Sequence, residues 1–442
     1  MIRDALDRTL RLMRDEPVGE IAEERLLHAL TSTVAVLIAD EATLRFHSAQ
    51  VALATTAQLA ARSGAKVFLI APEIELDVPQ PPLHGSRLVG GLLELGVDLL
   101  PGCAIENGAP RRSDIAVVFG AAGWDGTADM TFRVTASSWN ARMARSGPFA
   151  AWEGTGWPFG GLAGAALAAS ETFKASMRKL VGLARNPALH AELFAPAERA
   201  RYGFADPRLD GGHWRDPIDL GLFDMISAGA IAQSALFCLA QIPNVRGDAR
   251  LVEPERSDET NLNRYMLLRR SRVGMPKALD LASQGLGGMT LSANLERFGA
   301  DSANLPLRDR VLVGVDDIPV RWAVQSKWPK WLGIGATSHY GALVSHHAND
   351  LPCAGCLHPR DDAAVGPIPT AAFVSFWSGL LLASRLVRDA SGHPFGPEVQ
   401  QEYVATLRPE TGSWRSPVSP RSDCPVGCRA RGLEAGSLNA FA

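Results

Sequence analysis

Four cysteines near the end of the chain have the spacing of a metal site. Cys353 and Cys356 form one close pair, and Cys424 and Cys428 form a second, with 67 residues between the pairs. Four thiolates in two pairs suit a tetrahedral Zn²⁺ ion, which takes four protein ligands in structural sites. A redox dithiol would not need the second pair. We therefore expect a structural zinc site, with four unrelated thiols as the alternative. Four histidines near the first pair are weaker candidates for additional ligands: His339, His346, His347 and His358.

A second group of polar residues indicates a nucleotide site. Glu253 closes an expected strand 24 residues after Gly229, a spacing that suits an acid bonded to a ribose hydroxyl. Downstream, Arg264 and Lys277 supply positive charge for phosphates, because Arg binds phosphate bidentately and Lys acts as a compact charge. An ordinary solvated charge is the alternative for each of these residues.

Amides and carboxylates complete this group. Asn261 and Asn263 either position phosphate or ribose, or cap the following helix. Asp316 and Asp317 end another expected strand, where a carboxylate beside phosphates is a natural Mg²⁺ ligand. A turn or helix cap is the alternative. Arg321 is placed to form a local salt bridge with this pair.

The turn before the expected nucleotide site contains few glycines. Only Gly229 is present, while Ser227 and Ala232 stand where a G-x-G-x-x-G fingerprint would carry its outer glycines. The pattern argues against a dinucleotide, and therefore against an NAD dehydrogenase. A mononucleotide still fits, because a turn of small residues permits close approach of phosphate to the backbone.

Two α/β units must position these residues. Continuous apolar runs bounded by turns predict buried parallel strands, and Ala-rich stretches between them predict helices. Strands are expected at 33–39, 65–71, 115–119, 220–226, 249–252 and 310–315, and helices at 48–63, 86–95, 158–180 and 231–241. The turn after the first strand, residues 40–43, has two acids and no glycine, so the first unit is not expected to bind phosphate. The Pro- and Gly-rich residues 186–216 lack periodicity, and we expect a domain boundary near residue 210.

Composition excludes several classes of protein. The chain has 442 residues and a net charge of −3 without a long run of one sign, which gives no basis for binding nucleic acid or an anionic membrane. The N-terminal residues lack the apolar core of a signal peptide, and their apolar side chains instead predict a docked amphipathic helix. Residues 371–384 are too short a run for a membrane span of about 20 residues. We expect a soluble, cytoplasmic protein. The apolar face of the first helix comprises Ile2, Leu6, Leu10 and Met13.

Together these motifs resemble the ThiF/MoeB/ubiquitin-activating (E1-like) adenylating family over roughly residues 210–435. The family places an acid after the second strand, then a Ser/Thr-Asn-Leu-Asn/Gln-Arg run, then a Lys thirteen residues later. This chain has Glu253, the run at 260–264 and Lys277 in that register. Further on, the family has an Asp followed five residues later by an Arg, matched by Asp316 and Arg321. The two cysteine pairs flank a long apolar helix, as in the family.

The resemblance implies two Rossmann-like ThiF-type units in one chain, a pseudo-dimer. Residues 1–210 would be a degenerate, inactive adenylation half, and residues 211–442 the active ATP-binding domain with the four-cysteine zinc site. Inactive halves often supply an arginine to the partner's ATP site, for which Arg14 and Arg25 are candidates. ATP would lie over Gly229 and Asn261 with its ribose on Glu253. The residues implied in catalysis are Arg264 and Lys277, which hold phosphates, and Asp316, which holds Mg²⁺.

The implied reaction is adenylation of the C-terminal glycine of a ubiquitin-like protein, with a bacterial antiviral conjugation system as the expected setting; homodimerisation is left open. The chain departs from the family in its glycine turn, in Glu253 for Asp, and in Asp317 for Asn. Thioester-forming members also carry a cysteine between the Mg²⁺ Asp and the first cysteine pair, and residues 321–352 contain none. Cys238 lies on an apolar helix and Cys103 in the degenerate half. The adenylate would therefore pass to an E2-like partner thiol, unless one of the zinc cysteines is the nucleophile. A sulfur-carrier adenylyltransferase and a non-catalytic scaffold are the alternatives.

Overall fold

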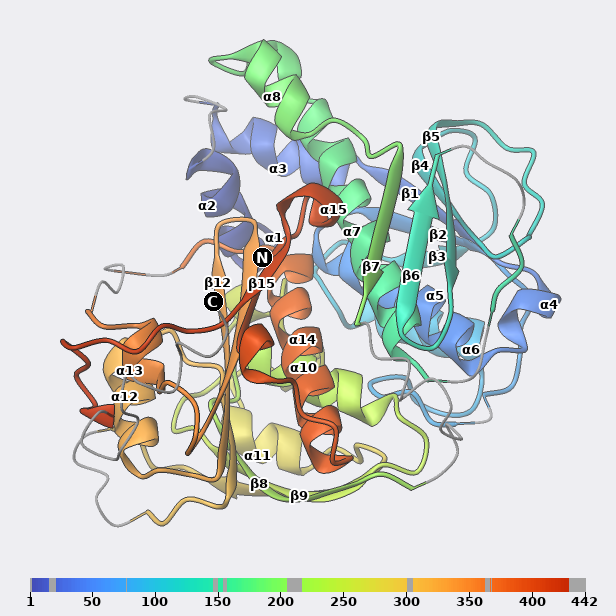
Figure 1. Cartoon of the computed structure of the whole chain (residues 1–442). Helices are drawn as coiled ribbons and strands as arrows, with labels where there is room; N and C mark the ends of the chain where they lie inside the picture. The colour runs from blue at the N-terminus through green and yellow to red at the C-terminus, as the bar shows by residue number, and fades with distance from the viewer. Residues whose placement is uncertain are drawn as a thin grey trace.

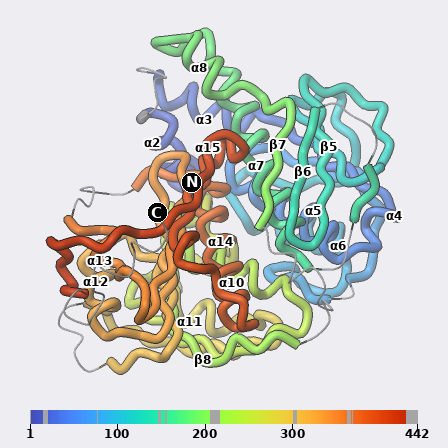
Figure 2. The backbone as a smooth tube through the Cα atoms, in the orientation of Figure 1, coloured from blue at the N-terminus to red at the C-terminus, as the bar shows by residue number. Residues whose placement is uncertain are grey.

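Two β-sheets of related topology form the framework of the protein (Figure 1). The computed structural model describes residues 2–15, 21–76, 78–145, 150–153, 157–204, 217–299, 305–361, 366 and 368–428. The domain boundary predicted near residue 210 falls outside these residues. Figure 2 shows the first sheet in the blue-to-green part of the chain and the second in the part from yellow-green to red.

The first sheet has seven strands in the order β3-β2-β1-β4-β5-β6-β7. The first five strands in this order, β3, β2, β1, β4 and β5, run parallel to one another. Strands β6 and β7 are antiparallel to their neighbours. Apolar, β-branched sequences form the central strands, in agreement with the expected positions of β1, β2 and β4. The strands are β1 (Val34–Ile38), β2 (Lys66–Ile70), β3 (Ile105–Asn107), β4 (Ser113–Phe119), β5 (Ala128–Ala136), β6 (Asn140–Ala144) and β7 (Arg199–Gly203).

The second sheet repeats this order as β10-β9-β8-β11-β12-β13-β14-β15, with β15 as an additional edge strand. Its first five strands are again parallel and the rest antiparallel. The expectation of two related α/β units is confirmed at this level. The strands are β8 (Asp219–Ile226), β9 (Arg246–Val252), β10 (Gly288–Asn294), β11 (Arg310–Val313), β12 (Trp331–Ser338), β13 (Gly341–Ala348), β14 (Gln401–Ala405) and β15 (Trp414–Ser416).

Four long helices pack between the sheets: α5 (His47–Arg62), α7 (Phe159–Arg178), α10 (Ala230–Ala240) and α14 (Ala372–Ala390). Glycines let α7 approach its neighbours closely, since a Cβ on Gly161 would stand 2.2 Å from the carbonyl oxygen of Ser48 on α5. The structure also describes the following helices of four residues or more: α1 (Ile2–Ala5), α2 (Asp7–Asp15), α3 (Glu23–Thr31), α4 (Glu41–Leu44), α6 (Leu88–Val97), α8 (Pro187–Leu193), α11 (Lys277–Ala282), α12 (Ile318–Ser326), α13 (Ala354–Leu357) and α15 (Pro409–Gly412).

One continuous hydrophobic core joins the two halves. The Phe173 ring on α7 lies 5.4 Å from the Phe373 ring on α14 and 5.8 Å from the Tyr340 ring, measured between centroids. Tyr202 of β7 packs edge-on against Trp377 of α14 at 4.8 Å. Aromatic side chains of the two halves therefore pack directly against one another in this shared core.

The N-terminal residues dock as predicted, although as two helices and not one. Leu6 lies at the break between α1 and α2, and Leu6, Leu10 and Met13 are all buried. Residues 186–204, expected to be irregular, contain α8 and β7, with the Asn186 side chain capping the helix by accepting a hydrogen bond from the Leu189 amide. The apolar run at 371–384 lies in α14 within the core. Among the described residues, no helix is long and apolar enough to cross a membrane.

Candidate functional site

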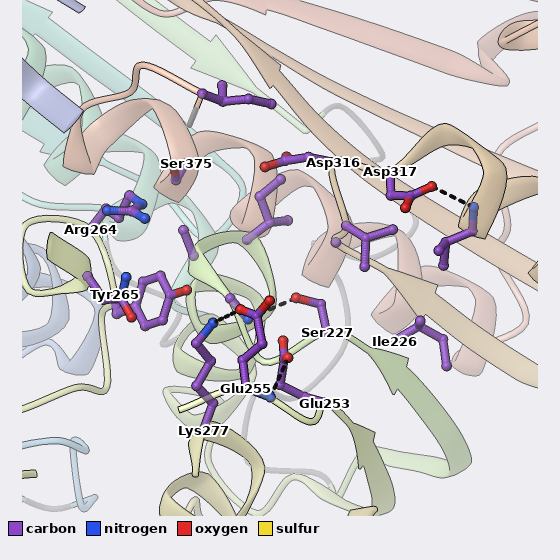
Figure 3. A pocket seen from close by; sticks show the side chains of 18 of the residues that line it. Ile226, Ser227, Glu253, Glu255, Arg264, Tyr265, Lys277, Asp316, Asp317 and Ser375 are labelled. Carbon is purple, nitrogen blue, oxygen red and sulfur yellow. Dashed lines mark hydrogen bonds and ion pairs between the residues drawn. The ribbon is translucent and has the colours of Figure 1, made fainter. Parts of the chain in front are cut away.

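A cavity of about 360 Å³ opens at the C-terminal ends of β8, β9 and β11, the edge where parallel α/β sheets bind ligands (Figure 3). Most of the residues predicted from the sequence to bind the nucleotide or Mg²⁺ line this cavity, whereas Asn263 and the arginine candidates Arg14 and Arg25 do not. The lining residues include Gly229, Glu253, Asn261, Arg264, Lys277 and Asp316. The structure thus brings the predicted residues together, whereas their individual roles stay predictions.

The turn between β8 and α10 keeps a glycine-like backbone without its first glycine. Ser227 has a φ of 116°, in the region that favours glycine. Its hydroxyl accepts a 2.9 Å hydrogen bond from the Gly229 amide, and Gly229 is the residue before the first turn of α10. The first amides of a helix have no carbonyl partner within the helix, and here Ala230 and Ile231, the first two residues of α10, line the cavity. This turn can therefore present N–H donors to an anion.

Glu253 extends from the end of β9 toward the same turn. One carboxylate oxygen accepts a 3.1 Å hydrogen bond from the Ala228 amide, and the other accepts one of 3.1 Å from the Glu255 amide. The Glu253 side chain is largely buried, and these two bonds fix the position of its carboxylate. Each oxygen keeps a further lone pair that can accept from a ligand in the cavity, as a ribose diol requires.

Two cations flank the Tyr265 ring on the opposite wall. The Arg264 guanidinium lies 5.3 Å and the Lys277 ammonium 5.7 Å from its centroid. Burial lowers the pKa of Arg264. Burial also opposes the charge on Lys277, but Tyr265, Glu253 and Glu255 outweigh it and raise the pKa of Lys277. Lys277 is therefore charged at neutral pH, and Arg264 is charged because an arginine guanidinium is not deprotonated in proteins.

Glu255 is a residue that the sequence interpretation missed. Its carboxylate forms a 2.6 Å ion pair with Lys277 and is half-exposed at the cavity. The hydrogen bond from Lys277 lowers the pKa of Glu255. Glu255 is the second residue after Glu253, within the same loop, so its position after a strand was the available signal.

The two asparagines have mainly structural contacts. The Asn261 side-chain oxygen accepts a 3.1 Å hydrogen bond from the Asp258 amide, which completes a capping box at the 3₁₀ turn Glu259–Asn261. Asn263 is buried, and its oxygen accepts a 2.9 Å hydrogen bond from Arg264. The sequence allowed each asparagine to bind a ligand or to cap a helix. Asn261 caps the 3₁₀ turn, and Asn263 supports the Arg264 side chain.

The sequence left open whether Asp316 and Asp317 are Mg²⁺ ligands or helix caps, and the two side chains differ in direction. Asp317 caps α12, because its carboxylate accepts a 3.0 Å hydrogen bond from the Val320 amide. Asp316 turns instead into the cavity (Figure 3). Desolvation raises the pKa of Asp316, against the opposing charges of Arg321, Arg264 and Arg8. Arg321 does not form the expected salt bridge within the described part of the chain; it donates to the Val315 carbonyl at 2.8 Å.

Arg8 reaches the cavity from the first half of the chain. The two arginines considered from the sequence lie elsewhere: Arg14 pairs with Glu23, and Arg25 is exposed. One Arg8 nitrogen donates a 3.3 Å hydrogen bond to the Ile368 carbonyl. No local signal distinguishes Arg8 in the sequence, because its position depends on the docking of α1 and α2 against a segment about 360 residues away.

The four cysteines of the two pairs converge on one point. Their sulfur atoms all lie within 4.8 Å of one another, with Cys353 to Cys424 at 3.3 Å and Cys356 to Cys428 at 3.2 Å. Four sulfurs about 2.3 Å from a tetrahedral Zn²⁺ would be about 3.8 Å apart, so the donors and spacing fit this ion. A hydrogen bond from Cys353 lowers the pKa of Cys356.

The histidines expected as weaker ligand candidates lie outside this cluster in the described part of the chain. His346 contacts Arg385, His347 donates to the Pro352 carbonyl, and His358 contacts Arg321. His339 lies beside the hydroxyl of Ser338, 3.4 Å away. The zinc-binding prediction therefore reduces to the four cysteines.

The two other cysteines are unsuited to nucleophilic attack. Cys238 on α10 is fully buried, and burial raises the pKa of its thiol. Cys103 is 6% exposed, and burial raises its pKa to about 11. Because the thiolate is the reactive form, neither side chain provides an activated nucleophile at neutral pH.

Comparison with known proteins gives similarities to parts of the chain. Residues 34–190 match the family model described as the BilD N-terminal domain. The protein named "Uncharacterized protein y4jF" of Sinorhizobium fredii (strain NBRC 101917 / NGR234) is 27% identical over 235 residues, which are 52% of this chain and 44% of that protein. The chain thus spans less than half the length of this curated relative.

Solved structures of the microcin C7 biosynthetic enzyme MccB are also similar to the chain. One contains N-formylated MccA, and two of the E. coli protein contain MccA, one of them also with AMPCPP. They are 13–14% identical to this chain, with TM-scores of 0.37–0.39, and cover 58% of it and 74% of their own chains. A likeness this distant carries no inference about function.

Proposed function

We propose that the protein binds ATP with Mg²⁺ in the cavity and adenylates the C-terminal glycine of a ubiquitin-like protein. One observation carries the proposal, namely the convergence of a small-residue turn, a strand-end acid, two cations and a second acid on one cavity. These are Gly229, Glu253, Arg264, Lys277 and Asp316. Each is of the type that its predicted role requires, and their distances in sequence match the family that the motifs resemble.

In this proposal each group has one task. The lone pairs left on Glu253 accept the ribose hydroxyls. The N-terminal amides of α10, with Arg264 and Lys277, hold the phosphates, for which Lys277 leaves its ion pair with Glu255. Asp316 and phosphate oxygens hold Mg²⁺, which prefers such oxygen ligands. Arg8, and neither Arg14 nor Arg25, is the arginine that the first half supplies.

The chemistry is a substitution at the α-phosphorus. A carboxylate oxygen of the terminal glycine forms a bond to that phosphorus, and the bond to the bridging α–β oxygen breaks. Pyrophosphate leaves with the electron pair, and the carboxylate becomes an acyl-adenylate. The cations stabilise charge that moves onto the leaving phosphates, so positioning and electrostatics supply most of the catalysis.

The acyl group then passes to a thiol of an E2-like partner. The partner sulfur forms a bond to the acyl carbon, AMP leaves with the electron pair, and the thiol proton is released to solvent. The burial of Cys103 and Cys238, together with the gathering of the other four cysteines, supports transfer without a thioester on this chain. A thiolate already bound to Zn²⁺ is also a poor candidate for this step.

We propose that the first half is an inactive adenylation unit. At the corresponding edge of its sheet, a shallow cavity at β1 and β2 has a mainly apolar lining without acids or cations. Asp40, after β1, caps α4 by accepting a 2.8 Å hydrogen bond from the Thr43 amide. The match to the BilD N-terminal domain covers residues 34–190 of this half.

The decisive experiment is ATP–pyrophosphate exchange with candidate ubiquitin-like proteins. We expect exchange with the native protein and a loss of at least about 100-fold with Asp316→Ala, the scale seen when an electrostatic group is removed from an active site. Asp317→Asn is the matched control, since its side chain caps α12 and still can, and it should retain exchange within a few-fold.

Absence of exchange with all candidates, alongside retained binding of one of them, would instead favour the non-catalytic scaffold. Exchange with a sulfur-carrier protein would favour the sulfur-carrier adenylyltransferase. A non-reducing gel of the same reaction should show no thioester on this chain. A thioester band that disappears in Cys103→Ala would contradict direct transfer to a partner.

A further inference from the structure

Residues 262–268 form a buried irregular loop that supplies two of the cavity side chains, Arg264 and Tyr265. The loop has neither helix nor strand, yet all seven residues are at most 7% exposed. Buried backbone without regular structure must find hydrogen-bond partners elsewhere. In this loop, several of the partners come from the first half of the chain.

Arg62, the last residue of α5, holds the backbone of this loop. Its guanidinium donates to the carbonyls of Leu262 at 2.6 Å, Met266 at 3.1 Å and Leu268 at 2.7 Å. The side chain is fully buried, and burial followed by the charge of Arg269 lowers its pKa to about 9. One planar guanidinium thus fixes three carbonyls within a seven-residue loop. A lysine ammonium lacks this planar arrangement of donors and does not reproduce it.

Thr9, on α2, holds the side chains of the loop. Its buried hydroxyl accepts a 2.9 Å hydrogen bond from the Asn263 amide nitrogen and donates to the Thr370 carbonyl at 3.4 Å. The other end of the same Asn263 side chain accepts a 2.9 Å hydrogen bond from Arg264. A chain of three hydrogen bonds therefore runs from Thr370 through Thr9 and Asn263 to the Arg264 guanidinium.

We propose that Thr9 and Arg62 are positioning residues for the nucleotide cavity, with Arg62 setting the loop backbone and Thr9 setting the direction of Arg264. The inference rests on the proposed function, since it assumes that Arg264 binds phosphate. Neither residue lines the cavity, so each acts through the residues that it holds. The inactive half then has a second task besides supplying Arg8, which is to order the loop that binds the phosphates.

Binding of ATP with Mg²⁺, measured by titration calorimetry on the full chain, tests the Thr9 contact without any protein substrate. Thr9→Val keeps the side-chain shape and removes the hydroxyl, so we expect about tenfold weaker binding. Thr9→Ser restores the hydroxyl and should bind within about twofold of the native protein. The matched control is Thr172→Val on α7, which removes a buried hydroxyl bonded within its own helix, to the Ala168 carbonyl at 3.0 Å.

Three results decide between positioning and general stability. Weaker binding in Thr9→Val but not in Thr172→Val, with rescue by Thr9→Ser, supports positioning. Native-like binding in Thr9→Val overturns it. An equal loss in Thr172→Val also overturns it, because the effect would then follow from stability alone.

Amide hydrogen exchange gives a second measurement that is independent of ATP. In Thr9→Val and in Arg62→Lys, peptides that cover residues 262–268 should exchange at least about tenfold faster, while peptides from β1 and β4 remain native-like. Unchanged exchange in this loop would overturn the proposal even if the native protein binds ATP. Conversely, a native protein that fails to bind ATP with Mg²⁺ disproves the proposed function, and the exchange data still decide whether Thr9 and Arg62 order the loop.

Discussion

At the scale of single residues, Ser227 shows that a turn can keep the backbone conformation of a glycine after the glycine itself is lost. The sequence lacks the first glycine of the fingerprint, and this absence argued against a dinucleotide-binding turn. The backbone nevertheless holds Ser227 at a φ of 116°, as a glycine there would allow. A non-glycine residue in such a conformation costs on the order of 1–3 kcal/mol. The turn has therefore kept its conformation at the expense of stability.

Replacement of Ser227 tests this strain. Ser227→Gly and Ser227→Ala both remove the hydroxyl that bonds the Gly229 amide, so they differ chiefly in backbone freedom. We expect Ser227→Gly to be more stable than Ser227→Ala by about 1 kcal/mol, because alanine retains the strain. Urea denaturation of the two variants measures the difference. Equal stabilities would mean that the positive φ is not costly here.

At this scale, the sequence did not predict which polar side chains cap a helix and which point into the cavity. Asn261 and Asp317 were open as ligands or caps, and both cap. Asn261, Asp317 and the adjacent Asp316 all line the cavity, but Figure 3 shows the Asp316 side chain directed into it, while the Asp317 carboxylate bonds the start of α12. Spacing along the chain located the group, but an Asn or Asp can bond a ligand or a helix end equally well. Only the direction of each side chain distinguishes these roles, and that direction depends on tertiary packing.

At the scale of elements, strand β13 carries two buried histidines. Burial, followed by the charge of Arg385, lowers the pKa of His346 to about 2, and burial lowers that of His347 to about 4. An unfolded histidine titrates near pH 6.5. A pKa lowered by folding means that stability is complete above about pH 6.5 and falls as the unfolded state takes up protons below it.

We therefore expect the free energy of unfolding to fall between pH 7 and pH 5.5 by about 1 kcal/mol for each of these histidines. His347→Asn should remove one such contribution and flatten the pH dependence. His339→Asn, at an exposed position nearby, is the control and should leave the dependence unchanged. Denaturant titrations at the two pH values measure the effect. An identical pH dependence in His347→Asn and the native protein would contradict the assignment.

Two helices, α13 and α12, connect the cysteine cluster to the cavity. Cys353 and Cys356 flank the start of α13, whose Ala354 amide donates a 3.0 Å hydrogen bond to Gln325 on α12. α12 begins directly after Asp316 and Asp317. A metal at the cluster would therefore stabilise the helix that follows the proposed Mg²⁺ ligand.

Metal analysis by mass spectrometry tests this arrangement. We expect about one zinc ion per native chain and none in Cys356→Ser, together with a lower unfolding temperature. Cys103→Ser replaces a buried cysteine outside the cluster and should retain the metal. Zinc retained at full occupancy in Cys356→Ser would exclude a four-cysteine site.

Burial alone did not make a strand predictable, because β12 and β13 are mostly buried and were not predicted from the sequence. Apolar runs located β1, β2, β4, β8, β9 and β11, the central strands of both sheets. The antiparallel strands β6 and β7 were not predicted, because their sequences NARMA and RARYG are rich in Arg and short in apolar residues. These strands lie toward one edge of the sheet. Their hydrogen bonds to neighbouring strands, and not a run of apolar residues, give them their strand conformation.

At the scale of the whole molecule, the shared strand order of the two sheets contrasts with their unequal sites. Acids and cations line the cavity at the C-terminal edge of the second sheet, while the cavity at the same edge of the first sheet has a mainly apolar lining. The contacts of Arg8, Thr9 and Arg62 with the second half were not predictable from the sequence. They join residues about 200 to 360 positions apart, and only docking of the halves brings them together.

The continuous core predicts that the halves do not fold well apart. A fragment of residues 217–442 would expose Tyr340, Phe373 and Trp377, which pack against the first half in the full chain. We expect this fragment to aggregate when it is expressed alone and to become soluble when it is co-expressed with residues 1–204. Light scattering of the purified fragments measures this. A monodisperse, cooperatively unfolding 217–442 fragment would contradict the prediction.

The docking of α2 also sets an order of events during synthesis. Thr9 leaves the ribosome among the first residues, but its partners follow 254 and 361 residues later. At about 5–20 residues per second, the wait for Thr370 is roughly 20–70 s. Until then the hydrogen-bond chain from Thr370 through Thr9 to Asn263 is incomplete, even after Arg264 and Lys277 have been translated. Under the proposed function, we expect a product interrupted before residue 370 to bind ATP more weakly than the full chain.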